Sequence, residues 1–134
     1  MLIDSHCHLT HPDLIVDIEN LLLRAKDAGV ERIITISDEV EDSEKCQKLA
    51  IKYEQIFYTV GMHPHHAIRF DANKDLPFLR TFFSDPKCKA VGEIGLDYHY
   101  MQSPKEVQRE VFRSQLMLAK ELQVPAVVHC REAI

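Results

Sequence analysis

The chain has 134 residues, of which 46% are hydrophobic, and its formal net charge is −5. This length and composition predict one globular domain or part of one, and no apolar run approaches the ~18–20 residues that a membrane span requires. The negative charge argues against a protein that holds duplex DNA mainly through a broad basic surface. A nucleic acid would have to bind at a local site, where bound metal ions can reverse the charge.

The first half of the chain alternates apolar runs with helical patterns. A strand over residues 2–6 precedes a helix that we expect to end at Gly29, a C-terminal cap. The apolar face of this helix comprises Leu14, Ile18, Leu21, Leu22 and Ala25. A second strand, residues 33–36, precedes a second helix marked by Cys46, Leu49, Ala50 and Tyr53.

The second half continues the alternation. Strands are predicted over residues 56–62, 90–94 and 125–130, with a helix that ends at Asp85-Pro86 between the first two. The residues Ser103 to Glu106 indicate a capping box with Pro104 at the first helical position, followed by an inner face of Val107, Val111, Leu118 and Leu122. Residues 131–134 are predicted to begin a fifth helix.

Strands that alternate with helices predict an α/β fold with a parallel sheet, and two architectures compete. One is a five-stranded doubly wound open sheet with strand order 2-1-3-4-5, and the other is the first five units of a (β/α)₈ TIM barrel. In the open sheet the tips of strands one and five would lie about 14 Å apart, too far to share a metal centre. In the barrel those tips converge, so a shared site would favour the barrel.

Histidines and a carboxylate stand at the predicted strand ends. His6 and His8 are two residues apart on the first strand, so their imidazoles face the same way and can share one divalent ion. Glu93 ends an apolar strand between Gly92 and Gly95, which allow another backbone to approach closely. We expect His6, His8, Glu93 and His129 to form a metal site.

Further polar residues flank this predicted site. Arg131 shares a strand face with His129, and its guanidinium suits contact with an anion. His63 follows the third strand and is expected to face the same end of the sheet, whereas His65 and His66 are interpreted as loop histidines. Three other residues are candidates for orienting the ligands through hydrogen bonds: Asp4, Asp97 and Tyr98.

Four segments, in order, resemble the signatures of the TatD family of metal-dependent deoxyribonucleases, which are amidohydrolase-like TIM barrels. They are residues 4–9 (DSHCHL), 61–65 (GMHPH), 92–98 (GEIGLDY) and 129–133 (HCREA). The resemblance implies a 3′-5′ exonuclease that acts on DNA with two divalent ions, Mg, Mn or Zn. His6 and His8 would hold one ion, His129 the other, and Glu93 would bridge them, which makes Glu93 and His129 the catalytic pair. His63 and Arg131 would bind the substrate phosphate.

The family pattern also has a histidine after strand six and an aspartate after strand eight, and neither lies within residues 1–134. The chain is therefore expected to be the N-terminal portion of one TatD-like domain, with impaired activity alone. Exposed sheet edges predict self-association or pairing with a C-terminal half. Two alternatives stay open: a metal-dependent hydrolase of another phosphoester or an amide, and a non-catalytic truncated fragment.

The cellular compartment is predicted from the cysteines and from the start of the chain. The four cysteines lie far apart, without the spacing of a disulfide framework, at positions 7, 46, 88 and 130. The first ten residues lack the basic and apolar segments of a secretory signal. We therefore expect a cytoplasmic protein with reduced thiols and no membrane partner.

Overall fold

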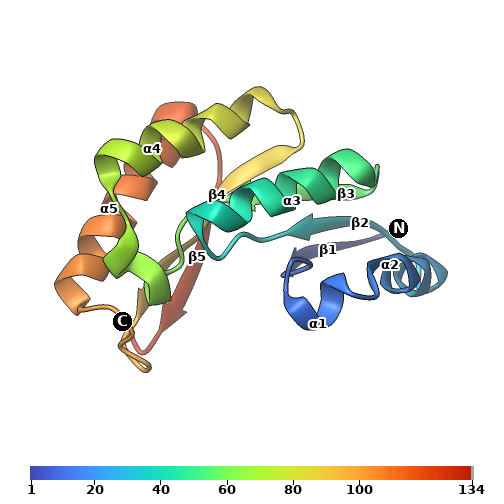
Figure 1. Ribbon diagram of the computed structural model, residues 1–134, viewed down its shortest axis with the longest axis horizontal. Coiled ribbons are helices and arrows are strands. Elements are labelled where there is room, and N and C mark those ends of the chain that lie inside the picture. The colour runs from blue at the N-terminus through green and yellow to red at the C-terminus, as the bar shows by residue number, and fades with distance from the viewer. Residues whose placement is uncertain (134) are drawn as a thin grey trace.

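The computed structural model describes residues 1–133, which form five parallel strands alternating with helices in a curled half-barrel (Figure 1). The strands are β1 (Leu2–Cys7), β2 (Val30–Thr35), β3 (Ile56–Val60), β4 (Cys88–Asp97) and β5 (Ala126–Arg131). They are hydrogen-bonded in sequence order, β1-β2-β3-β4-β5, and every neighbouring pair is parallel. This confirms a partial TIM barrel, and the doubly wound order 2-1-3-4-5 was wrong.

The helices connect consecutive strands along the chain. They are α1 (Pro12–Ile15), α2 (Ile18–Asp27), α3 (Val40–Lys52), α4 (Ala72–Thr81) and α5 (Lys105–Leu122), with 3₁₀ turns η1 (Pro64–Arg69) and η2 (Phe82–Ser84). The single first helix that was predicted is broken between Ile15 and Ile18. As expected, the chain leaves α2 through Gly29, whose φ of 85° suits glycine.

Two predicted helix starts differ from the structure. Pro104 is the N-cap of α5 rather than its first helical residue, and no side chain caps the helix. The Ser103 hydroxyl instead donates to His65 O (3.1 Å) and accepts from Ile68 N (3.0 Å), so it ties down the preceding loop. Residues 131–133 do not begin a helix, because Arg131 is the last residue of β5; Ile134 lies outside the described residues.

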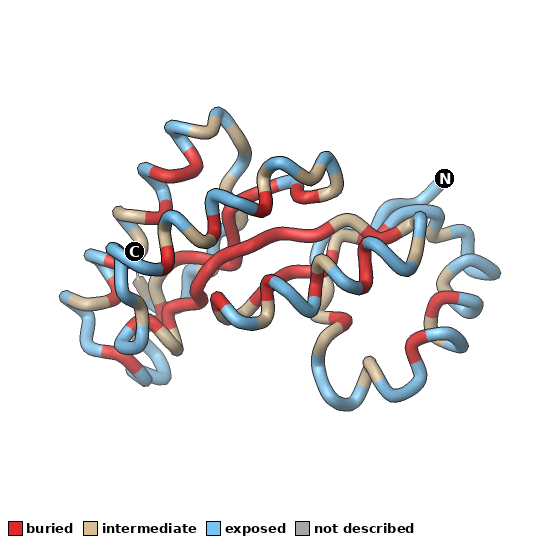
Figure 2. The backbone as a smooth tube through the Cα atoms, turned by 45° about the horizontal axis from the view of Figure 1, so that its top comes forward, coloured by how far each residue is buried: buried red, intermediate tan, exposed pale blue. Residues whose placement is uncertain are grey.

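The hydrophobic core lies along the middle strands. Figure 2 shows buried residues gathered at the centre of the molecule, with exposed residues along the outer turns of the helices. The core includes Ile33, Ile56, Val60, Val91 and Ile94, each at most 3% exposed. Within residues 1–133, no helix is long and apolar enough to cross a membrane.

The outer strands have one strand neighbour each, β2 for β1 and β4 for β5. Several apolar residues of these strands are exposed to solvent as a result: Leu2 is 58% exposed, Ile3 56% and Val128 51%. Strands of a parallel sheet are normally covered on both faces and paired on both edges. These two edges therefore leave apolar surface and backbone hydrogen-bonding groups unpaired by any other strand of residues 1–133.

Glycines let β4 approach β5 closely at the end that carries Glu93. A Cβ added to Gly92 would lie 2.6 Å from Val127 Cβ, and one added to Gly95 would lie 2.0 Å from His129 O. Gly95 also has a φ of +145°, a conformation that other residues rarely adopt. The predicted reason for these glycines, close backbone approach, is confirmed.

We expect Gly95→Ala to lower the free energy of unfolding by about 3 kcal/mol or more, because its methyl group would overlap backbone that cannot move aside without distorting the sheet. Gly29→Ala is the matched control. It also places alanine at positive φ but meets no atom within 4 Å, so it should cost about 1–2 kcal/mol. Urea unfolding of both variants measures the difference, and equal losses would contradict the close-approach argument.

Candidate metal centre

His6 and His8 meet Glu93 at the carboxyl end of the sheet. His6 Nε2 lies 3.4 Å from Glu93 Oε2, and His8 Nε2 lies 3.5 Å from the same oxygen. Nitrogen and oxygen ligands bind ions such as Zn²⁺ at about 2.0–2.2 Å, which places two ligands of a tetrahedral shell about 3.3–3.6 Å apart. The observed spacing therefore fits three ligands around one divalent ion.

A backbone carbonyl orients the His8 imidazole toward Glu93. His8 Nδ1 lies 3.1 Å from Ile36 O, and because a carbonyl only accepts, Nδ1 carries a proton. In the neutral ring the lone pair is then on Nε2, the nitrogen that faces Glu93. The contact with Glu93 raises the pKa of His8, although burial opposes this, so a proton and a metal ion compete for Nε2.

Glu93 is a buried, ionised carboxylate whose backbone is held by β3 and by the loop after β2. Its backbone N–H donates to Ser37 O (2.9 Å), and the preceding Gly92 O accepts from Thr59 Oγ1 (2.6 Å). Burial raises the pKa of Glu93, but the hydrogen bond with His8 and the surrounding histidines outweigh it and lower the pKa to about 2. A fixed negative charge thus lies between the imidazoles.

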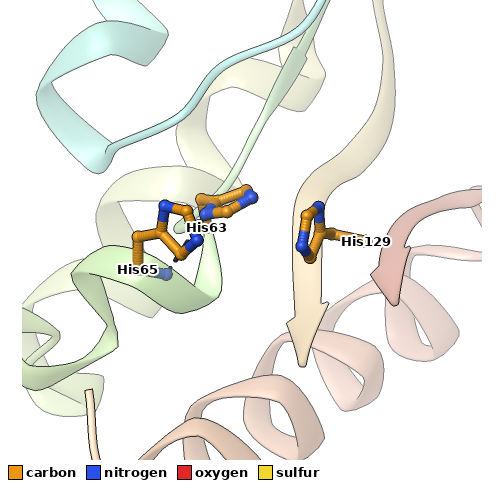
Figure 3. A group of neighbouring side chains, drawn as sticks. All are labelled: His63, His65 and His129. Atoms are coloured by element: carbon orange, nitrogen blue, oxygen red, sulfur yellow. Dashed lines mark hydrogen bonds between the residues drawn. The ribbon is translucent and has the colours of Figure 1, made fainter. Parts of the chain in front are cut away.

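A second group of ligand atoms joins Glu93 from the other side. Figure 3 shows the His129 ring, from β5, facing the rings of His63 and His65 in the loop after β3. The His63 ring centroid lies 4.4 Å from that of His65 and 4.4 Å from that of His129. His129 Nδ1 lies 3.2 Å from Glu93 Oε1, so the two carboxylate oxygens of Glu93 face different histidine groups.

The loop after β3 fixes the chemical state of His63. His63 caps η1, with its Nδ1 accepting the backbone N–H of His65 (3.1 Å). Burial lowers the pKa of His63 to about 3, although the charge of Glu93 opposes the shift, so the ring is neutral. Because Nδ1 accepts, Nε2 carries the ring proton and can donate a hydrogen bond.

Arg131 lies at the same end of the sheet but outside both groups. Its guanidinium carbon lies 4.7 Å from the centre of the Tyr100 ring, and the residue is exposed. Tyr100 in turn lies against His65, with 5.5 Å between ring centroids. The guanidinium is therefore beside the histidines, with donors open to a ligand.

The structure brings together all four residues predicted as metal ligands: His6, His8, Glu93 and His129. It also brings in His65, which the sequence interpretation left in a loop. His63 and His65 are separated by one residue, Pro64, at the start of a 3₁₀ turn, and this turn directs both rings to the site. That spacing was a usable signal, although a loop sequence does not show which way the turn faces.

Asp97 occupies the space behind the His65 and His129 rings. Its Oδ2 lies 2.8 Å from His65 Nε2 and 2.9 Å from His129 Nε2. Burial raises the pKa of Asp97, but hydrogen bonds from the Tyr100 backbone, His65 and His129 outweigh it and hold the pKa below its usual range. Two of the three imidazoles in this group therefore point their Nε2 atoms at a carboxylate, not at a common ligand position.

Comparisons with known proteins identify the family of the chain. A family model described as TatD related DNase matches residues 3–134. The chain is 38% identical over 133 residues to the uncharacterized metal-dependent hydrolase YabD of Bacillus subtilis, covering 99% of this chain and 52% of that protein. It is 32% identical over 130 residues to the 3′-5′ ssDNA/RNA exonuclease TatD of Escherichia coli K12, covering 97% and 50%.

A solved structure shows the same fold. The crystal structure of YJJV, a TatD homologue from Escherichia coli K12, matches with a TM-score of 0.90 and 34% sequence identity, covering 98% of this chain and 51% of that one. The chain thus spans about half the length of the relatives it matches.

Proposed function

Since the chain belongs to the TatD-related DNase family, we propose that it supplies the first half of a two-metal hydrolase that cleaves DNA phosphodiester bonds from the 3′ end. Residues 1–134 would then be the N-terminal portion of one TatD-like barrel domain. The observation that carries this proposal is the placement of Glu93, whose two oxygens face His6 and His8 on one side and His129 on the other.

The proposed ligand sets follow from these contacts. His6, His8 and Glu93 would hold one divalent ion, and His129 would hold a second one that Glu93 bridges to the first. Mg²⁺, Mn²⁺ and Zn²⁺ are the candidates, and histidine ligands favour Zn²⁺ or Mn²⁺ over Mg²⁺ in binding strength. When bound, such a pair supplies Lewis acidity, lowers the pKa of water and clamps the attacking and leaving oxygens of an in-line displacement.

His63 and Arg131 would hold the substrate phosphate beside these ligands. The His63 ring is neutral, and because its Nδ1 accepts the His65 backbone N–H, its Nε2–H can donate to a phosphate oxygen. Arg131 presents an exposed fork of donors, stacked on Tyr100, that suits a phosphodiester. The negative chain would thus grip nucleic acid through a few donors at one end of the sheet.

Glu93→Gln is expected to weaken binding of both ions by tenfold or more, because it removes the charge and the bridging oxygens from both ligand sets. Isothermal titration of the chain with Zn²⁺ or Mn²⁺ measures the affinities. His66→Gln is the matched control: His66 lies one residue from His65 but faces Glu39 (3.4 Å) and belongs to neither ligand group. Unchanged affinity in Glu93→Gln would refute the proposed metal centre.

The proposal that DNA is the substrate is tested with a panel of compounds, each with Mg²⁺ or Mn²⁺. The panel contains 3′-labelled single-stranded DNA, RNA, small phosphoesters and amides. The 134-residue chain should cleave DNA slowly, because the resemblance places two further ligands beyond residue 134. A chimera that joins this chain to the second half of the Escherichia coli K12 exonuclease TatD should cleave DNA from the 3′ end much faster. Glu93→Gln in this chimera should abolish cleavage.

Other outcomes decide between the remaining alternatives. A metal-loaded chimera that hydrolyses amides or small phosphoesters but not DNA would overturn the nuclease assignment and favour another hydrolase. Full activity of the 134-residue chain would contradict the expected impairment. A chain that binds no metal would favour a non-catalytic fragment.

We also propose that the exposed edges of β1 and β5 pair with further polypeptide, either a second copy or a C-terminal half. In sedimentation velocity the chain should associate as its concentration rises, and Ile3→Lys on β1 should reduce this association. Leu23→Lys is the control, because Leu23 on α2 is similarly exposed, 59% against 56% for Ile3, but does not lie on a sheet edge. Equal effects of the two variants would contradict edge pairing.

A further inference from the structure

Asp97 has every lone-pair position of its buried carboxylate engaged. Oδ1 accepts the backbone N–H groups of His99 (3.1 Å) and Tyr100 (2.9 Å). Oδ2 lies 2.8 Å from His65 Nε2 and 2.9 Å from His129 Nε2. A carboxylate offers about four acceptor positions and no donor, so each of the two imidazoles must present a proton on Nε2.

The proton on Nε2 determines what the other His129 nitrogen can do. A neutral imidazole carries one ring proton, so Nδ1 of His129 then has a free lone pair. This nitrogen lies 3.2 Å from Glu93 Oε1, which is also a lone-pair atom. Two lone pairs that face each other at that separation repel, so a metal ion between them would be bound by both atoms.

We propose that Asp97 is a positioning residue that fixes the Nε2–H tautomer of His129 and thereby makes Nδ1 the metal-binding nitrogen. The inference rests on the proposed second ion at His129 and Glu93, and it names the ligand atom. Histidines that bind metal usually donate the other ring N–H to a carboxylate or a carbonyl, and His8 does so to Ile36 O on the opposite side of Glu93.

Helix α5 holds Asp97 in place through a buried glutamine. Gln108 Oε1 accepts the backbone N–H of Asp97 (2.8 Å), while Gln108 Nε2 donates to Asp97 O (2.9 Å) and to Ser103 O (2.7 Å). Gln108 is 0% exposed, so these bonds do not compete with water. Gln108 therefore holds both backbone polar groups of Asp97, which fixes the position of the carboxylate relative to the imidazoles.

The same helix face fixes the neighbouring loop in the same way. Gln115, seven residues further along α5, accepts from Met62 N (2.8 Å) and donates to Met62 O (3.1 Å), directly before His63. Seven residues are about two helical turns, so both glutamines lie on one side of α5. Helix α5 thus fixes both the loop after β3, which carries His63 and His65, and the end of β4, which carries Asp97.

The test compares the wild-type chain with Asp97→Asn. Asparagine keeps an oxygen for the His99 and Tyr100 amides but turns an NH₂ donor toward the imidazoles, which favours the opposite ring tautomer without removing the side chain. Long-range ¹H–¹⁵N spectra of the metal-free chain at pH 8 report the tautomer, and His129→Gln identifies the His129 signals. We expect Nε2–H in the wild type and Nδ1–H in Asp97→Asn.

The second readout is metal affinity. Asp97→Asn should weaken the ion at His129 by about 10- to 100-fold and leave the ion at His6 and His8 within twofold. Asp75→Asn is the matched control, because Asp75 is a buried carboxylate on α4 that lies in neither ligand group and whose Oδ2 accepts the Asp71 backbone N–H (2.8 Å). It should change neither the His129 tautomer nor the metal affinities.

The outcomes separate this inference from the proposed function. Nδ1–H on His129 in the wild type, or an unchanged tautomer in Asp97→Asn, would overturn the role of Asp97. The wild-type spectrum decides this even if Asp97→Asn does not fold. A wild-type chain with the Nε2–H tautomer that binds no second ion would support the orienting role and refute the proposed metal pair.

Discussion

The site depends on one constraint: a buried carboxylate, Glu93, must stay ionised among the imidazoles of two histidine groups. Its two oxygens divide the surrounding histidines into a β1 pair and a group from β5 and the loop after β3. An isolated buried charge is costly, so the arrangement persists only if cations, protons or metal ions, compensate it. The histidine nitrogens can accept either kind of cation, which is why a metal centre is the chemistry that this geometry supports best.

Rigid contacts away from Glu93 set the direction of each imidazole. A carbonyl orients His8, a backbone amide caps His63, and the Asp97 carboxylate engages His65 and His129. The glutamines of α5 fix the loops on which two of these contacts depend. Metal ligands that are oriented in this way need little reorganisation when an ion binds, so ordering the side chains costs little binding free energy.

Local patterns predicted one helix cap wrongly and missed two buried side chains on α5, in both cases because tertiary contacts decide the outcome. The motif at Ser103 has the letters of a capping box, yet its hydroxyl bonds to the loop at His65 and Ile68, because those partners are brought near by the fold. Apolar periodicity correctly placed the inner face of α5, because Val111 and Leu118 are buried and Val107 and Leu122 pack against the core, but it did not indicate that Gln108 and Gln115 are fully buried. A buried glutamine is stable only when backbone groups satisfy its amide, and no local pattern shows such partners.

The sequence by itself determined the alternation of strands and helices, the position of each polar residue at a strand end, and the glycines that allow β4 to approach β5. These depend on periods of two and 3.6 residues and on the absence of a side chain, which are local properties. Only the tertiary structure decided the strand order, the turn that brings His65 to His129, and the bonds that join Asp97 to both rings. Those features depend on contacts between residues 23 positions or more apart, which no local period of the sequence specifies.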